Sequence, residues 1–141
     1  MNEPNGYEIA VDTDRINADR VHHWLSTDAY WALGREHDIV ERAIRGSINI
    51  GAYDNTGDQV AYARIVTDLA TFAWLCDVYV DRDHRGTGLG RALVTAARDH
   101  LAPYKLERIV LATQDAHGLY SRLGFAPLPD PEHWMVLSAE G

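Results

Sequence analysis

The sequence is poor in the features that mark several large classes of protein. It has one cysteine, Cys76, among 141 residues. An internal disulfide is therefore excluded, and a reducing compartment is expected. No apolar run approaches the length of about 18 residues that suggests a membrane-spanning helix. Residues 1–14 also lack the apolar segment of a secretory signal. These absences predict a cytoplasmic protein with no attachment to a membrane.

Basic side chains are also fewer than acidic ones. The 13 lysines and arginines are outnumbered by 21 aspartates and glutamates, which gives a formal net charge of −8. Because phosphate contacts dominate the affinity of proteins for nucleic acids, this balance argues against nucleic acid as a partner. It is compatible with a cationic amine substrate. The seven histidines are scattered and show no H-x-x-x-H spacing, so no metal site is expected.

What the sequence does contain is an ordered series of strand and helix patterns, which predicts a single domain over residues 1–141. Strands are predicted at 7–11, 47–53, 59–67, 72–80 and 109–112, with two further strands near Phe125 and at 134–137. Helices are predicted at 17–25, 38–45, 89–101 and 116–123. The series predicts a mixed α/β fold.

The most informative segment is a glycine-rich loop between the strand at 72–80 and the helix at 89–101. It reads Arg85-Gly86-Thr87-Gly88-Leu89-Gly90. A strand, a glycine loop and a helix in this order direct free backbone N–H groups and a helix N-terminus at one point, which suits a phosphate. A P-loop is excluded because Arg91 and Ala92 follow where lysine and serine or threonine are needed. A dinucleotide fingerprint is excluded because it needs glycine at position 91.

A different pattern fits this loop, and a second segment supports it. Arg85, Gly88 and Gly90 fit arginine or glutamine, two residues, glycine, one residue, then glycine or alanine. Downstream, residues 116–125 fit A-x-x-L-Y-x-x-x-G-F. In both segments the chain resembles the GNAT superfamily of N-acetyltransferases, and its predicted elements match that fold along nearly the whole length. The resemblance implies a mostly antiparallel central sheet flanked by helices, and acetyl-CoA as acyl donor.

The resemblance also implies where acetyl-CoA binds. The end of the strand at 72–80 would pair with the pantetheine arm like an added strand, and the N–H of Val78 would polarise the acetyl carbonyl. The loop would receive the pyrophosphate. Arg91 either adds charge there or is a solvated arginine in the first turn of a helix. The implied donor-binding residues are Val78, Tyr79, Val80, Arg85, Gly86, Thr87, Gly88, Leu89, Gly90, Arg91 and Thr113, the last at a position where family members often have asparagine.

Two residues are candidates for the chemistry of transfer. Tyr120 matches the tyrosine that family members use as general acid to the leaving thiolate; alternatively, it only packs against the cofactor sulfur or the core. Asp77 is a lone carboxylate in an apolar strand, where alternation would turn it away from Cys76 and Val78. It is either a general base or amine-binding group, or a partnered structural carboxylate. Asp115, His117 and deprotonation through water are rival routes.

The acceptor site is predicted in the N-terminal half, around Tyr30, Trp31 and Arg35, with His117 as a further candidate. The aromatic rings suit an amine with an apolar body, whereas Arg35 suits a carboxylate-bearing acceptor such as an amino acid. Alternatively, the rings cover the core. The sequence thus predicts a monomeric or dimeric acetyl-CoA-dependent N-acetyltransferase acting on a primary amine of a small molecule by direct attack. The alternatives are acetylation of a protein or peptide amine, and a non-catalytic acyl-CoA-binding regulatory module.

Overall fold

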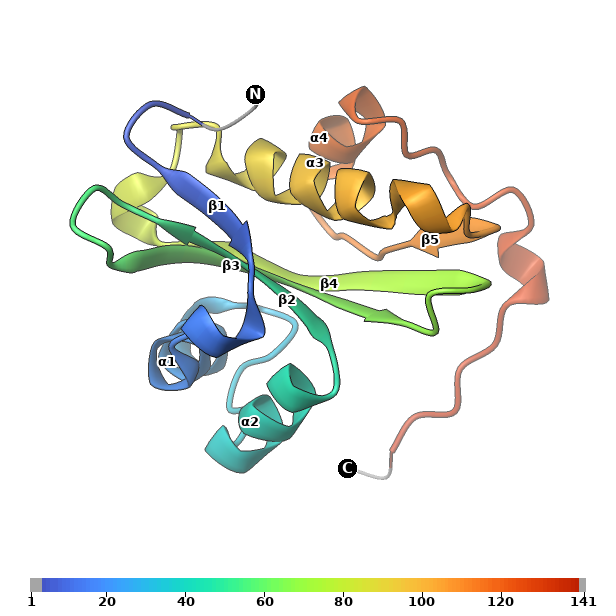
Figure 1. Ribbon diagram of the computed structural model, residues 1–141. Helices are drawn as coiled ribbons and strands as arrows, with labels where there is room; N and C mark the ends of the chain where they lie inside the picture. Colours follow the sequence, from blue (N-terminus) through green and yellow to red (C-terminus); the bar gives the residue numbers. More distant parts are fainter. Residues whose placement is uncertain (1–3, 140–141) are drawn as a thin grey trace.

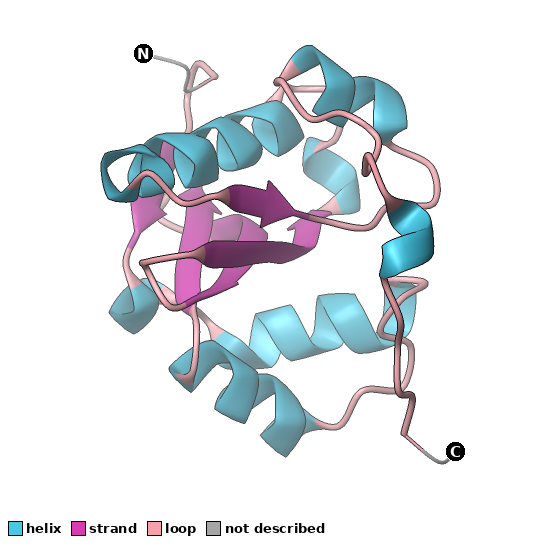
Figure 2. Ribbon diagram, turned by 90° about the vertical axis from the view of Figure 1, so that its right-hand side faces the viewer, coloured by secondary structure: helices cyan, strands magenta, loops and turns pink. Residues whose placement is uncertain are grey.

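The computed structural model describes residues 4–139, in which helices cover both faces of one five-stranded sheet (Figures 1 and 2). The strands are β1 (Glu8–Val11), β2 (Ile48–Tyr53), β3 (Gln59–Thr67), β4 (Phe72–Val80) and β5 (Arg108–Val110). The helices are α1 (Ala18–Asp28), α2 (His37–Arg45), α3 (Leu89–Leu101) and α4 (His117–Arg122). Short 3₁₀ helices occur at Thr13–Arg15, Arg82–His84, Ala102–Tyr104 and Pro131–His133.

The sheet is mixed and mostly antiparallel, as predicted. Its order is β1-β2-β3-β4-β5; the first three pairings are antiparallel and β5 runs parallel to β4. The helix α3 connects these two parallel strands and lies with α4 on one face of the sheet, while α1 and α2 lie on the other (Figure 1). No helix within residues 4–139 has the length and apolar character needed to cross a bilayer.

The central strands are buried on both faces because each face has its own apolar core. On β3, Ala61, Ala63 and Ile65 pack into the core beneath α3. Tyr62, which alternates with them, packs with Val21 and Leu25 of α1 in the second core. This alternation follows from the two-residue period of a strand. It sends every second residue of β3, including Arg64, toward the face that carries α1 and α2.

A β-bulge interrupts β4 at Asp77. Arg64 of β3 pairs with Cys76, but Tyr62 pairs with Tyr79, so two residues of β4 lie opposite Ala63 alone. Asp77 takes the left-handed backbone conformation, with φ of 54°. The extra residue resets the alternation, and the Asp77 carboxylate reaches Arg64 on the same face as Cys76. The prediction that Asp77 faces away from Cys76 is therefore wrong.

The two strands predicted near Phe125 and at 134–137 are also wrong, since residues 123–139 form no strand. Pro127, Pro129 and Pro131 have no N–H to give to a ladder. Farther on, residues 135–137 form no regular secondary structure and are 86–99% exposed, so apolar character alone does not bring them into the sheet. The fifth predicted strand is present in a shorter form, as β5.

Candidate active site

The site lies where β4 and β5 separate. The two strands pair only over Phe72–Trp74 and Arg108–Val110. Beyond Trp74, β4 continues to Val80 with β3 as its only strand partner among residues 4–139. One edge of its last residues, Val78, Tyr79 and Val80, therefore has no neighbouring strand. The chain after β5 continues into the loop that leads to α4. Figure 2 shows the sheet from the side. An extended ligand could add to the edge of β4 in this gap.

The glycine loop begins five residues after β4. Gly86 and Gly88 have φ of 77° and 89°, the left-handed region that glycine enters without strain. Gly88 is the N-cap of α3 and offers no side-chain cap. The backbone N–H groups from Gly86 to Arg91, including those of Thr87 and Leu89, have no acceptor among residues 4–139. This row of free donors at a helix N-terminus fits a pyrophosphate, as expected for the donor.

Two hydrogen bonds hold the side chain of Arg85, the first residue of this loop. Its Nε donates to the carbonyl oxygen of Val80 at 2.9 Å, and its Nη2 donates to Asp28 Oδ2 at 3.1 Å. Asp28 also accepts a hydrogen bond from the Tyr79 hydroxyl at 2.6 Å and pairs with Arg82. The Arg82 guanidinium and the Tyr79 hydroxyl hold the pKa of Asp28 well below its usual range. In this arrangement Arg85 joins α1 to the end of β4. Its contact with a pyrophosphate stays a prediction.

The helix α4 places Tyr120 close to the loop. Leu119 packs near Gly90, where an added Cβ would lie 3.9 Å from a Leu119 methyl group. Tyr120 is half-buried beside the core under α3 and meets Phe125 edge-on, with ring centroids 5.8 Å apart. Burial raises the pKa of the Tyr120 phenol. The phenol therefore stays protonated at neutral pH, as a proton donor must. Gly124 ends this helical turn with φ of 100°, in the left-handed region that glycine enters without strain.

The remaining predicted residues lie around the entrance to α4. Thr113 is half-buried, and its hydroxyl accepts from the N–H of Ala116 at 3.0 Å, which shapes the turn before the helix. Arg91 and His117 are exposed in the first turns of α3 and α4. The hydroxyl of Tyr30 accepts from the N–H of Gln114 at 2.8 Å. That bond joins the loop after α1 to the loop before α4.

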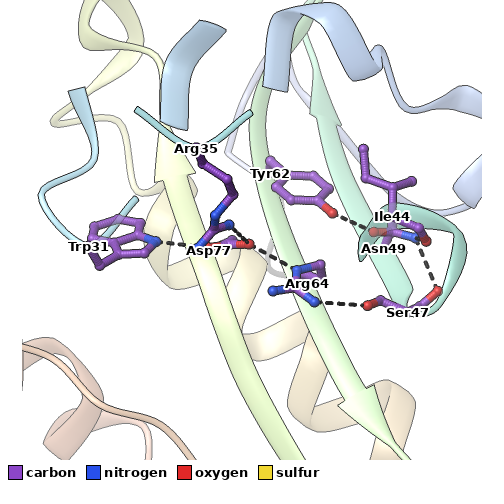
Figure 3. A network of polar contacts seen from close by, with 8 residues as sticks. All are labelled: Trp31, Arg35, Ile44, Ser47, Asn49, Tyr62, Arg64 and Asp77. Atoms are coloured by element: carbon purple, nitrogen blue, oxygen red, sulfur yellow. Dashed lines mark hydrogen bonds and ion pairs between the residues drawn. The ribbon is translucent and has the colours of Figure 1, made fainter. Parts of the chain in front are cut away.

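Asp77 contacts two other predicted residues, Trp31 and Arg35, and a third residue that was not predicted, Arg64 (Figure 3). Its Oδ1 accepts from Trp31 Nε1 at 2.8 Å, and its Oδ2 accepts from Arg35 Nη1 at 3.0 Å and Arg64 Nε at 2.9 Å. Asp77 as a whole residue is 4% exposed. These contacts agree with the alternative in which Asp77 is a partnered structural carboxylate. The general-base role stays a prediction.

Arg64 is the functional candidate that the sequence reasoning missed. The alternation of β3 groups it with Tyr62 and Val66, and nothing in its neighbours along the chain singles it out. In the structure it binds Asp77 and also donates from Nη1 to Ser47 Oγ at 3.1 Å (Figure 3). One signal was available: an arginine inside an apolar strand needs a buried partner, and a lone aspartate stands in the adjacent strand.

A second polar group, beside this cluster, anchors the end of α2. The Tyr62 hydroxyl donates to Asn49 Oδ1 at 2.5 Å, and Asn49 Nδ2 donates to the carbonyl oxygens of Ile44 and Ser47 at 2.8 and 3.1 Å (Figure 3). Burial raises the pKa of Tyr62. These bonds fix Ser47, which in turn holds Arg64. Within residues 4–139, no group of three histidine, cysteine or carboxylate side chains is arranged to hold a metal ion.

Known proteins are similar to this chain in sequence and in fold. Residues 18–125 match the family described as Acetyltransferase (GNAT) family. A Gibberella zeae protein named as a candidate acetyltransferase is 30% identical over 135 residues, which cover 82% of this chain and 76% of that protein. The crystal structure of a candidate GNAT-family acetyltransferase from Xanthomonas campestris has a TM-score of 0.91 and 39% identity, covering 97% of this chain and 96% of that one.

A more distant likeness concerns the fold alone. Glucosamine-6-phosphate N-acetyltransferase from Arabidopsis thaliana has a TM-score of 0.66 at 17% identity, with 95% of this chain and 97% of that chain covered.

Proposed function

Since the chain belongs to the GNAT family of acetyltransferases, we propose that it transfers an acetyl group from acetyl-CoA to a primary amine of a small molecule by direct attack. The family implies an acyl-CoA donor. The observation that carries the proposal is the loop from Gly86 to Arg91, whose N–H groups lie at the N-terminus of α3, next to the open edge of β4, and have no acceptor among the described residues.

The donor is assigned to these two features. The N–H groups of the loop would bind the pyrophosphate, and the left-handed glycines leave its approach free of Cβ atoms. The end of β4 would hold the pantetheine arm as an added strand, with the N–H of Val78 directed at the acetyl carbonyl. The bulge at Asp77 supports this role for Val78, because a bulge releases backbone groups from the ladder.

In the transfer, the protein stabilises the carbonyl oxygen, supplies a proton to the leaving group and positions the acceptor. The neutral amine attacks the acetyl carbonyl carbon, a C–N bond forms and the C–S bond breaks. The N–H of Val78 stabilises negative charge on the carbonyl oxygen, and the Tyr120 hydroxyl gives its proton to the departing thiolate sulfur. The amine loses its extra proton to water, and the Tyr120 phenolate takes up a proton from water, which restores the acid. Asp77 acts in positioning, because its oxygens already accept from Trp31, Arg35 and Arg64.

A small acceptor is favoured by the hydrogen bond between Tyr30 and Gln114. It ties together two loops that border the site, whereas a peptide would need an open groove. The test is amine-dependent release of CoA thiol from acetyl-CoA by the purified protein, over a panel of amines, amino acids, polyamines and peptides. Turnover with small amines is the expected result. Turnover restricted to peptides would contradict the small-molecule acceptor.

A further inference from the structure

The cluster around Asp77 contains more positive than negative charge. Two guanidinium groups, of Arg35 and Arg64, share the single carboxylate of Asp77. Within residues 4–139, no second carboxylate lies within 4.0 Å of either guanidinium. Burial raises the pKa of the neighbouring Cys76 thiol to about 11, so this thiol is neutral at neutral pH. One positive charge is therefore left without a partner.

This surplus charge is sheltered yet reachable. The side chains of Arg35 and Arg64 are 23% and 15% exposed, and that of Asp77 is 3% exposed. An unpaired charge in such surroundings lowers the stability of the folded protein, and the fold itself does not require one. A guanidinium carries five N–H donors. Arg35 uses one nitrogen, Nη1, and Arg64 uses Nε and Nη1, so the remaining nitrogens have no acceptor among residues 4–139. They can bind an incoming anion.

The position of the cluster relates it to the reaction. Asp77 directly precedes Val78, which is assigned to the acetyl carbonyl, and both residues belong to the bulge in β4. The cluster lies on the face of the sheet that carries α1 and α2, whereas the glycine loop starts α3 on the other face (Figures 1 and 3). An anion on the arginines would therefore belong to the acceptor. The indole of Trp31, 41% exposed, borders the same place.

We infer that the acceptor is an amino carboxylate, such as an amino acid, whose carboxylate is bound by Arg35 and Arg64 while its amine faces the acetyl group. The inference rests on the proposed function and specifies its substrate class. A carboxylate fits better than a phosphate ester, because one unpaired positive charge matches a monoanion, whereas a phosphate ester carries a charge of about −1.5 to −2 at neutral pH. Arginine also binds carboxylates with two parallel hydrogen bonds.

The test compares each common L-amino acid with its primary amide as acceptor, since the two differ only at the carboxyl group. We expect the best amino acid to exceed its amide at least tenfold in kcat/KM. Arg35→Met should reduce this ratio to within twofold, mainly through a higher KM for the amino acid, and Arg35→Lys should restore part of it. In both variants Asp77 still accepts hydrogen bonds from Arg64 and Trp31. Arg42→Met, at an exposed arginine of α2, is the control and should keep the wild-type ratio.

A second measurement separates this inference from the proposed function. Calorimetry in the presence of CoA compares the affinity of N-acetyl amino acids with that of their amides, and it does not depend on turnover. Equal use and equal binding of acids and amides would overturn the inference while leaving acetyl transfer intact. A failure to acetylate any amine would overturn the proposed function, and the binding comparison would still decide the inference. An unchanged ratio in a folded Arg35→Met variant would also overturn it.

Discussion

At the scale of single residues, Asp77 does the most to shape the site. Its carboxylate ties the loop after α1, through Trp31 and Arg35, to β3, through Arg64. Removing the charge of a buried carboxylate that pairs with two guanidinium groups lowers protein stability, because both cations then lack their anionic partner. Asp77 therefore positions the residues that we propose to surround the acceptor.

Replacing Asp77 with asparagine tests this positioning role. The amide NH2 would face donors, either Trp31 Nε1 or the two arginines, so a repulsive contact replaces a hydrogen bond. We expect Asp77→Asn to lower the free energy of unfolding by about 3 kcal/mol, measured by urea denaturation. Asp99→Asn, at an exposed position of α3, is the control and should change it by less than about 0.5 kcal/mol.

The same variant separates positioning from base catalysis. We expect Asp77→Asn to raise KM for the acceptor and to keep the low-pH limb of kcat/KM. If the folded variant instead lost that limb while KM stayed at its wild-type value, Asp77 would be the general base.

Tyr120 carries the proposed proton transfer. Burial raises the pKa of its phenol, so the proton is available over the whole neutral range. Tyr120→Phe should reduce kcat on the order of 10²-fold, with acetyl-CoA affinity unchanged in calorimetry. Tyr104→Phe, at an exposed tyrosine, serves as the matched control. A kcat within twofold of wild type, under conditions where chemistry limits turnover, would remove Tyr120 from the mechanism.

At the scale of elements, the glycine loop and α3 form the proposed donor site, and the loop depends on backbone conformations that side chains resist. Gly88 has φ of 89° and Gly57, in the hairpin between β2 and β3, has φ of 90°. Among residues 4–139, a Cβ at Gly57 would meet nothing within 4 Å, and one at Gly88 would meet Pro4 alone, at 3.7 Å. A side chain would therefore be similarly strained at both positions, but only Gly88 lies in the glycine loop.

Valine at each of these positions separates folding from binding. Both Gly88→Val and Gly57→Val should lose on the order of 1–2 kcal/mol of stability, because a Cβ is strained at positive φ. Only Gly88→Val should weaken CoA binding, by at least about tenfold or 1.4 kcal/mol. Calorimetry on both folded variants makes the comparison. An equal loss of affinity in the two variants would mean that the loop does not bind the donor.

Elements with a strong local pattern were predictable from sequence, and those decided by tertiary contacts were not. The bounds of α3 match the prediction because Leu89, Leu93 and Leu101 recur at helical spacing and are all buried. The bulge at Asp77 was not predictable, because an aspartate in left-handed conformation within a strand has no signature in its neighbours. The segment 134–137 has a strand pattern, yet residues 135–137 are exposed, because a strand also needs a partner.

The predicted acceptor residues show the same division. Trp31 and Arg35 were identifiable as aromatic and charged residues in one loop, and the structure joins them to Asp77. The assignment of Arg64 needed the pairing of β3 with β4, which depends on long-range register. The contacts of Arg85 with Asp28 and Val80 likewise connect segments that no local pattern relates.

At the scale of the whole molecule, Asp28 links the N-terminal helices to the end of β4 and to the loop. The Arg82 guanidinium and the Tyr79 hydroxyl lower its pKa in the folded state. A lowered folded-state pKa stabilises the fold at pH values above the ordinary aspartate pKa of about 4, and this contribution is lost as the pH falls below it.

Asp28→Asn should therefore be less stable than wild type at neutral pH and should lose less stability on acidification. Urea denaturation at a series of pH values from neutral to about 3 measures both effects. Parallel stability–pH curves for the two proteins would show that Asp28 does not contribute in this way.

The central claim, acetyl transfer to an amine, is tested most directly by following the purified protein with acetyl-CoA and a panel of amines and amino acids. CoA thiol and acetylated product are quantified together, thiol by colorimetry and product by mass spectrometry. The account predicts CoA release that depends on the amine, with one N-acetylated product formed for each thiol released. Binding of acetyl-CoA without amine-dependent release of CoA from any acceptor would contradict it.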